Sequence, residues 1–281
     1  MKTPSTRLLM LNVAAILVGL AAVAAVIRSF VVTPATTPCS ERYVTTMVFP
    51  LERDGLVLSA TDIHARTGGG DASGLENLEI IRLRKGPATA AMSVSLPKGA
   101  AAPNSGASPK GGVSFPWQPR ALREQSSVCL SYQVQLPGDF DFNLGGQLPG
   151  IAGRSDQSDD RFLVQAGWRQ GGVIGASNFV MLGGKKWKQV AEGDGPAIAR
   201  GRWVRIDQEV VLNAPDQENG ILRIWVDGAL ALDKSDFVYR NKPGVGLTGV
   251  AADVFYSGED VAARSPADAT VLLTPFEIRW Q

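Results

Sequence analysis

Apolar and polar residues alternate in short segments along most of this chain of 281 residues. Such alternation is typical of β-strands that bury one face, and clusters of Gly, Pro, Asn and Asp separate the segments. The predicted strands are 89–96, 128–135, 162–166, 173–182, 203–212, 221–226, 250–256 and 270–280. Together with 31 glycines and 17 prolines, the pattern predicts an all-β fold, an antiparallel β-sandwich or jelly roll of the concanavalin-like kind.

Local signals refine this prediction. Asp227-Gly228 is a strong hairpin signal between residues 225–226 and 229–232. Residues 96–112 are rich in Pro, Gly, Ala and Ser, which predicts a long surface loop within one domain. No helical periodicity of any length appears after residue 34, so no further helix is expected there.

The N-terminus has a different pattern. Residues 8–27 carry no charge and only one strongly polar residue, Asn12, and a helix of about twenty residues matches a bilayer core. Lys2 and Arg7 precede this run, which predicts that the N-terminal side stays in the cytoplasm and that the rest is exported. The alternative is a signal peptide cleaved near residues 22–24, but the apolar run is longer than the usual about 7 to 15 residues.

These features divide the chain into three predicted parts. Residues 1–33 form a cytoplasmic stub with a transmembrane anchor or signal helix, 34–42 form a linker, and 43–281 form the jelly-roll domain. The predicted location is periplasmic or extracellular, with residues 8–27 anchoring the protein to the inner membrane. Any contact with a membrane is expected through this N-terminal segment alone.

Composition limits the classes of partner. The chain is 44% apolar and 20% charged with a net charge of +1, which suits one large domain and gives no global field for a polyanion. We therefore expect no nucleic-acid partner, and contact with an acidic polymer would need a local basic groove. Since the chain has a single histidine, His64, neither a zinc site nor a histidine-based triad is predicted. Asp139 and Asp141 could hold calcium, but Asp-rich turns are common without metal, so no metal or other cofactor is predicted.

The two cysteines are Cys39, beyond the apolar run, and Cys129, in a predicted strand. Export would make a disulfide between them possible, and it would tie the linker to a central strand. Two unrelated buried thiols are the alternative.

The most distinctive motif is Gly-Gly-Gln-Leu-Pro-Gly at residues 145–150. Its glycines allow a close approach of the backbone, and Pro149-Gly150 predicts a turn next to Gln147. The accompanying motifs, in order, are Leu-Pro-Lys-Gly at 96–99, Lys-Gly-Gly-Val-Ser-Phe at 110–115, Gly-Arg-Trp-Val at 201–204, Leu-Asn-Ala-Pro at 212–215, Asn-Gly at 219–220 and Trp-Val-Asp-Gly at 225–228. In this order they resemble polysaccharide lyase family 14, the alginate lyases, and their glucuronan-lyase relatives, over residues 43–281.

The resemblance implies a ligand groove on the concave face of one sheet, near Tyr132, Gln147, Gln165 and Asn178. In the family the position of Gln147 is usually Lys, and Leu163 and Gln165 stand where Ser and Arg are expected. A Gln amide can donate to a carboxylate but cannot act as acid or base at neutral pH. The candidate catalytic residues are Gln147, Gln165 and Tyr132.

Proton transfer would then depend on a tyrosine or lysine, and the candidates are Tyr132, Tyr239, Tyr256 and Lys185. Lys185, Lys186 and Lys188 surround Trp187, which suits an acidic sugar chain, although a solvated hairpin tip explains the cluster equally well. The candidate substrate-binding residues are Lys185, Trp187, Asn178, Trp168 and Arg169.

The predicted function is that of a polysaccharide lyase-like protein that acts on or binds an acidic, uronate-containing polysaccharide by β-elimination chemistry, with weak or absent activity expected. The alternative is a non-catalytic carbohydrate-binding module of the cell envelope. A sandwich that mediates protein contacts is a third class, because fold alone does not choose among functions. The polymer could be alginate, glucuronan or an envelope glycan.

Overall fold

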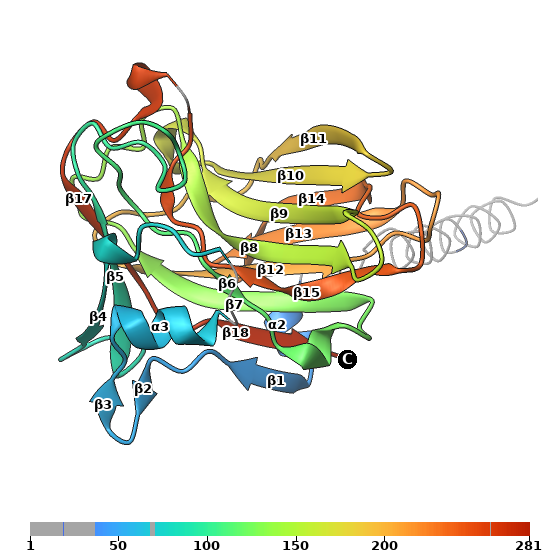
Figure 1. Cartoon of the computed structure of the whole chain (residues 1–281), viewed down its shortest axis with the longest axis horizontal. Coiled ribbons are helices and arrows are strands. Elements are labelled where there is room, and N and C mark those ends of the chain that lie inside the picture. The colour runs from blue at the N-terminus through green and yellow to red at the C-terminus, as the bar shows by residue number, and fades with distance from the viewer. Residues whose placement is uncertain (1–18, 20–36, 68–70, 259) are drawn as a thin grey trace, which may run out of the picture. The chain divides into compact units, whose positions relative to one another are not determined.

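A computed structural model describes residues 19, 37–67, 71–258 and 260–281 (Figure 1). Residues 38–281 form a compact unit of their own. The predicted membrane or signal segment at residues 8–27 lies outside the described residues, apart from Gly19. Among the helices that the structure describes, none has the length and apolar character needed to cross a membrane.

Two large antiparallel sheets form the body of the compact unit, which confirms the predicted jelly-roll sandwich, and β2 (Glu52–Arg53) and β3 (Leu56–Val57) form a small separate sheet (Figure 1). The nine-stranded sheet runs in the order β14 (Ala229–Phe237), β13 (Gly220–Val226), β12 (Trp203–Val211), β7 (Ser127–Gln135), β17 (Ala269–Leu273), β5 (Ala90–Leu96) and β4 (Leu78–Arg82), and β18 (Glu277–Trp280) joins β7 to β1 (Thr45–Val48). The seven-stranded sheet runs in the order β11 (Lys185–Glu192), β10 (Ile174–Leu182), β9 (Arg161–Trp168), β8 (Gly146–Ser155), β15 (Val245–Ala251) and β6 (Pro116–Trp117), with β16 (Phe255–Tyr256) also paired to β8.

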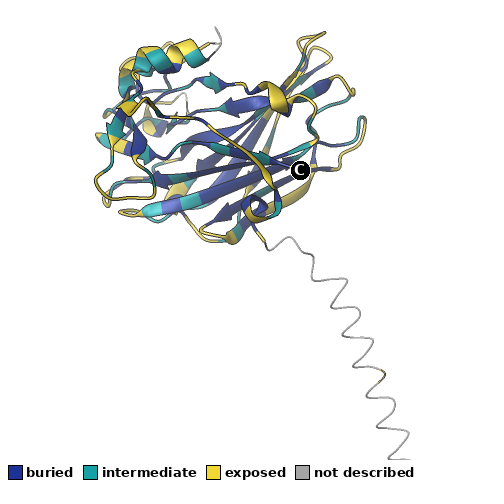
Figure 2. Ribbon diagram, turned by 90° about the horizontal axis from the view of Figure 1, so that it is seen from below, coloured by how far each residue is buried: buried dark blue, intermediate teal, exposed yellow. Residues whose placement is uncertain are grey.

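The core lies between the two sheets, where each strand contributes every second side chain. On β7 these are Val128, Leu130, Tyr132 and Val134, and on β9 they are Phe162, Val164, Ala166 and Trp168. Figure 2 shows the buried residues concentrated in the strands and the exposed ones in loops and edges. The intervening residues of β9 therefore point away from the core, to the opposite face of the seven-stranded sheet.

Several elements differ from the sequence prediction. The predicted hairpin at Asp227-Gly228 is present and joins β13 to β14. Strand β8 was not predicted, because its sequence is rich in Gly and Pro. The expectation of no helix after residue 34 is wrong, because α3 (Ala60–Arg66) follows a capping box formed by Ser59 and Asp62. Helix α2 (Cys39–Arg42) is a second short helix. Both are too short to show a periodicity in the sequence.

The outer face of the nine-stranded sheet holds a second, smaller core. Cys39 and Cys129 form a disulfide with a Cα–Cα distance of 5.7 Å, and Tyr43 and Trp225 pack around it. Residues 38–42, which the sequence placed in a linker, therefore belong to the compact unit.

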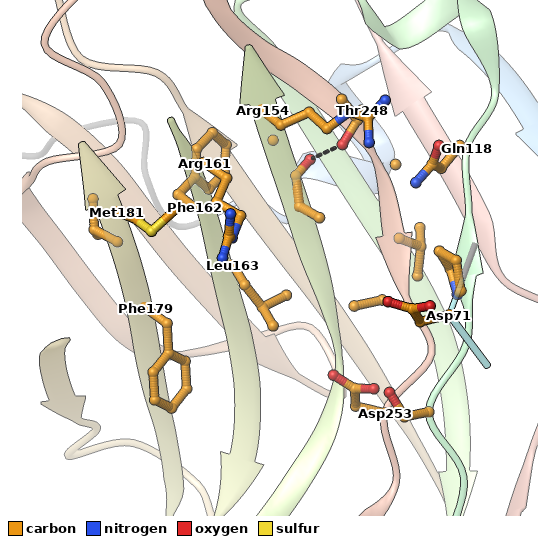
Figure 3. Close-up of a pocket in the computed structure, with 18 of the residues that line it drawn as sticks. Asp71, Gln118, Arg154, Arg161, Phe162, Leu163, Phe179, Met181, Thr248 and Asp253 are labelled. Carbon is orange, nitrogen blue, oxygen red and sulfur yellow. Dashed lines mark hydrogen bonds between the residues drawn. The ribbon is translucent and has the colours of Figure 1, made fainter. Parts of the chain in front are cut away.

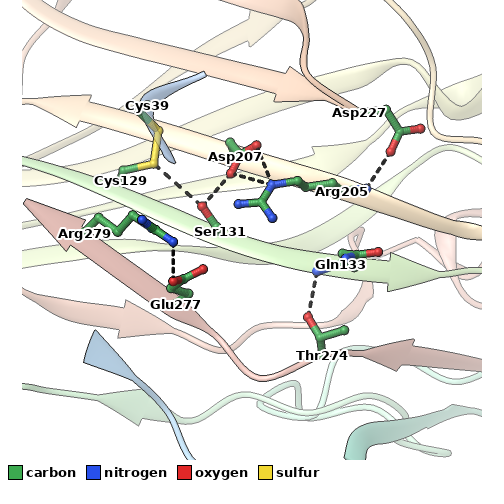
Figure 4. Close-up of polar contacts among 10 residues, drawn as sticks. All are labelled: Cys39, Cys129, Ser131, Gln133, Arg205, Asp207, Asp227, Thr274, Glu277 and Arg279. Carbon is green, nitrogen blue, oxygen red and sulfur yellow. Dashed lines mark hydrogen bonds and ion pairs between the residues drawn. A yellow bond between two sulfur atoms is a disulfide. The ribbon is translucent and has the colours of Figure 1, made fainter. Parts of the chain in front are cut away.

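Buried carboxylates on this face have cationic partners. Glu209 accepts hydrogen bonds from Arg42 at 2.8 Å and from Arg223 at 3.2 Å. Asp207 accepts bonds from Ser131 and Arg205, next to the disulfide (Figure 4). Because the charges are paired and hydrogen-bonded, their burial is tolerated.

We predict that replacing both cysteines, Cys39→Ala with Cys129→Ala, lowers the free energy of unfolding by about 2–4 kcal/mol, because the bridge closes a long loop in the unfolded chain. Chemical denaturation of the variant and of the wild type measures the difference. A thiol titration of the denatured, unreduced wild type should detect no reactive thiol, and two thiols per chain would contradict the pairing.

Candidate functional site

The face of the seven-stranded sheet that points away from the core, here called the groove face, carries the polar residues of interest. Register places Gln165 beside Ser177 and Leu163 beside Phe179 on the neighbouring strand β10. A pocket of about 690 Å³ opens on this face (Figure 3). The groove face is therefore the surface on which a ligand would lie.

The pocket combines apolar and cationic side chains. Leu163, Phe179 and Met181 contribute apolar surface, while Arg154 and Arg161 contribute charge (Figure 3). Phe179 is 41% exposed, so its ring is available for stacking. A ring flanked by cations suits a sugar that carries a carboxylate.

Strand β11 adds a row of cations to this surface. Lys188 is paired in register with Phe179, and its Nζ lies 4.8 Å from the centre of that ring. Lys186 and Trp187 line the pocket, whereas Lys185 lies at the exposed end of the strand and is not among the lining residues. Of the predicted hairpin cluster, Lys186 thus faces the pocket and Lys188 lies over the ring of Phe179. Trp187 is also a lining residue, but it is paired with the core residue Val180, so its side chain points to the other face of the sheet.

Gln147 is held on the groove face by the local geometry of β8. It pairs with Gly167 of β9, and a β-bulge follows between Gln147 and Gly150. Gly167 lacks a side chain, and a Cβ there would lie 2.3 Å from the carbonyl oxygen of Gly146. The side chain of Gln147 is buried, and its Oε1 accepts no hydrogen bond from the residues that the structure describes.

Gln165 contacts a residue that the sequence analysis missed, Asp253. The Nε2 of Gln165 donates a hydrogen bond to Oδ2 of Asp253, and Oδ1 of Asp253 is buried without a hydrogen-bond partner among the described residues. Burial raises the pKa of Asp253 to about 6, and an interaction with the Ser114 hydroxyl acts in the opposite direction. A charged residue within the apolar segment 249–256 was the available signal for it.

Arg169 brings a positive charge to the same part of the groove face. It follows β9, and its side chain turns back so that Nη2 donates to Ser177 Oγ at 3.4 Å. A Cβ on Gly175 would lie 2.7 Å from Nε of Arg169, so the glycine makes room for the guanidinium. Burial lowers the pKa of Arg169 and Glu192 raises it, but arginine keeps its charge in proteins.

The structure places three predicted site residues in the core instead. Tyr132 lies in the other sheet, where its hydroxyl donates to the Pro149 carbonyl at 3.4 Å. Asn178 donates to Gln189 Oε1 and to the Val238 carbonyl, both at 3.1 Å. Trp168 is fully buried and donates to the carbonyl of Phe142 at 3.1 Å. Substrate contact by these residues does not agree with their inward orientation.

The other tyrosines also lie away from the groove face. Tyr239 donates to the carbonyl of Ile221 and Tyr256 to that of Asp141, and burial raises the pKa of both hydroxyls. Tyr43, whose pKa is raised to about 12 mainly by burial, bonds to Glu209 on the outer face of the other sheet. A tyrosine therefore cannot supply proton transfer in the groove.

The sequence matches the model of a known protein family over most of its length. The model of the family described as polysaccharide lyase 14 matches residues 84–174 and 191–276. No curated protein sequence matches the chain. The matched regions include Gln147, Gln165, Arg169 and Asp253, whereas most of β10 and β11 lies between them.

Solved structures show the same fold at low sequence identity. A marine PL-14 alginate lyase from Aplysia kurodai is 17% identical, with a TM-score of 0.67 over 85% of this chain and 99% of that one. A variant of alginate lyase Aly36B in complex with alginate trisaccharide is 16% identical, with a TM-score of 0.61 over 84% and 98%. An endo-β-1,4-glucuronan lyase from the fungus Trichoderma reesei is 8% identical, with a TM-score of 0.56 over 85% and 96%.

The free energy of unfolding can test the placement of Trp168 in the core and of Trp187 at the surface. We predict that Trp168→Ala lowers the free energy of unfolding by about 3–5 kcal/mol, because it removes a large side chain from the core. The matched control Trp187→Ala should change it by less than about 1 kcal/mol, because Trp187 is 37% exposed. Chemical denaturation measures both, and equal losses would contradict the assignment of Trp168 to the core.

Proposed function

Because this chain belongs to the polysaccharide lyase 14 family, we propose that it holds an acidic polysaccharide on the groove face and acts on it by β-elimination. One observation carries the proposal, the concentration of cations on this single face of a nearly neutral protein. The cations are Arg154, Arg161, Arg169, Lys186 and Lys188. Alginate and glucuronan, on which proteins of the same fold act, are polymers of uronic acids.

Arg169 is the residue best placed to neutralise a uronate carboxylate. Its guanidinium lies over Gly167 and Gly175 on the groove face, and the amide of Gln147 is its neighbour at Gly167. Elimination needs a cation or hydrogen-bond donor on the carboxylate, because neutralisation makes the adjacent C5 proton more acidic. It also needs a group that removes this proton and a group that protonates the departing oxygen.

A second candidate function is binding without turnover, as a carbohydrate-binding module of the cell envelope. The observation that favours it is the placement of all the tyrosines away from the groove face. With Gln147 and Gln165 as amides, neither of these residues can move a proton at neutral pH. A binding module of this kind would hold the polymer in the cationic groove without cleaving it.

We also propose that the protein is exported from the cytoplasm. It rests on the uncharged run at residues 8–27 with basic residues before it, and on the disulfide between Cys39 and Cys129, which is typical of oxidising compartments. The protein would then meet its polymer in the periplasm or outside the cell, tethered by its N-terminal segment. Proteolytic mapping of the mature N-terminus tests the tether, and a chain that begins after residue 25 would contradict it.

We predict that Arg169→Gln weakens binding of alginate or β-1,4-glucuronan by about tenfold to a hundredfold, since a hydrogen bond to a charged group contributes about 1.5–3 kcal/mol. Affinity gel electrophoresis or calorimetry on the full chain measures the change, with thermal unfolding as a check on the fold. The matched control is Arg84→Gln, an exposed arginine beyond β4 in the other sheet, which should leave affinity unchanged. Equal affinity of Arg169→Gln and wild type would contradict the assigned role.

Ultraviolet detection of unsaturated uronate separates the two candidate functions. Product from alginate or glucuronan would support the lyase, whereas retention of a polymer without product would support the binding module. Neither retention nor product would contradict both.

A further inference from the structure

The groove face contains a carboxyl group with no assigned role, Asp253. It lies between β15 and β16, lines the pocket and is 4% exposed (Figure 3). Its backbone is fixed, because Val254 and Val113 exchange hydrogen bonds of 3.0 and 3.1 Å. The side chain therefore has a defined position at the wall of the pocket.

The contacts of Asp253 connect it to the proposed uronate site. Gln165 donates to one carboxyl oxygen, and the register partner of Gln165 is Ser177, to which Arg169 donates. The carboxyl and the guanidinium thus lie on the same face, on either side of Gln165. The second oxygen of Asp253 is buried and forms no hydrogen bond within the described part of the chain, although the Ser114 hydroxyl interacts with this carboxyl, and a buried polar atom normally forms one. A ligand or a bound proton would satisfy it.

Competing groups on the groove face are less suited to proton transfer. Asp71 also lines the pocket, but it is exposed. Burial and the charge of Arg169 lower the pKa of Lys188, yet its ammonium lies over the ring of Phe179. His64 is on α3, outside the pocket lining.

From this geometry we infer that Asp253 is the catalytic residue that moves the proton, an inference that rests on the proposed lyase function. Its carboxylate removes the proton from C5 of a uronate whose carboxylate is held by Arg169. The C5–H electron pair forms the C4=C5 double bond, and the C4–O4 bond breaks with its electron pair going to O4. The carboxylic acid then passes the same proton to O4 and becomes a carboxylate again.

The surroundings of Asp253 support a group that both accepts and donates a proton. Its pKa of about 6 arises from burial, so both protonation states are accessible near neutral pH. The side chains that contact it are the uncharged Gln165 and Ser114, and Asp71 is the charged group that shares its part of the pocket (Figure 3). A cation in place of Gln165 would hold Asp253 ionised and make it a poor acid.

The main test compares Asp253→Asn with the wild type. We expect Asp253→Asn to lower kcat on alginate or glucuronan by about a hundredfold or more, with retention of the polymer unchanged. The substitution conserves shape, and the Asn carbonyl can still accept the bond from Gln165. The matched control Asp236→Asn removes an exposed carboxylate of β14 in the other sheet, away from the pocket, and should keep wild-type turnover.

The pH profile of the wild-type protein gives a second readout, which does not depend on the folding of a variant. Since the base acts in its ionised form, kcat of the wild type should be high above about pH 6 and fall below it. In Gln165→Arg the added cation should stabilise the carboxylate and move this limb to lower pH. A flat wild-type profile between about pH 5 and 8 would overturn the inference.

The outcomes also distinguish this inference from the proposed function. Loss of turnover in Asp253→Asn with intact binding supports both. Undiminished turnover in Asp253→Asn overturns the role of Asp253 and leaves the lyase in place. A wild type that retains alginate or glucuronan without releasing unsaturated product overturns the role and supports the binding module. A wild type that retains neither polymer and releases no product overturns the proposed function as well.

Discussion

The seven-stranded sheet depends on glycines that leave room for large side chains of a neighbouring strand. On the core side, a Cβ at Gly146 would lie 2.0 Å from the ring of Trp168, and one at Gly153 would lie 2.1 Å from that of Phe162. The rings cover the glycine backbone near both ends of β8, which keeps the sheet closely packed against the core. Any side chain at these positions would push the aromatic core away from the strand.

The same constraint operates on the groove face. Gly167 and Gly175 form a register pair, and the side chain of Arg169 lies over them. A larger residue at Gly175 would displace the guanidinium of Arg169, which is the positive charge beside Gln147. The glycines that fix the core on one face of the sheet thus have counterparts that shape the candidate site on the other.

Much of the fold could be predicted because burial on one side imposes an alternating pattern. That pattern identified β7, β9, β10, β12 and β13, but it could not identify β8, where glycines remove the apolar signal. Alternation also shows which residues share a face, and Trp168 has the same parity as Phe162, Val164 and Ala166. These apolar companions point to the core, so the assignment of Trp168 to substrate contact overlooked a signal that was present.

The candidate site was predictable only in part. Gln147, Gln165 and Arg169 lie within one stretch of sequence, and the structure brings them together. Asp253 is 88 residues from Gln165, and the pairing of β15 with β8 carries it to the site. No local pattern reports such a contact, because it depends on strand order.

Charge segregation explains how a protein with a net charge of +1 can present a cationic groove. On the outer face of the nine-stranded sheet, Asp207 and Glu209 are buried among arginines that neutralise them. The ion pairs among the described residues include none of the groove cations, and burial favours the neutral form of Asp253. The net charge of the sequence is a sum over both faces and does not show this difference. The electrostatic field at the groove therefore depends on the fold.

The family match divides the groove into two parts with different physical roles. The matched regions hold Arg169, Gln165 and Asp253, the groups that would neutralise a carboxylate and move a proton. The stretch between them, residues 175–190, holds Phe179 and Lys188, which offer stacking and charge to a sugar ring. Stacking and charge set affinity for a polymer, whereas elimination needs the acid, the base and the cation at one ring. On the proposed function, β10 and β11 would therefore determine which polyuronate is held, and the contacts among β8, β9 and the segment before β16 would determine whether it is cleaved.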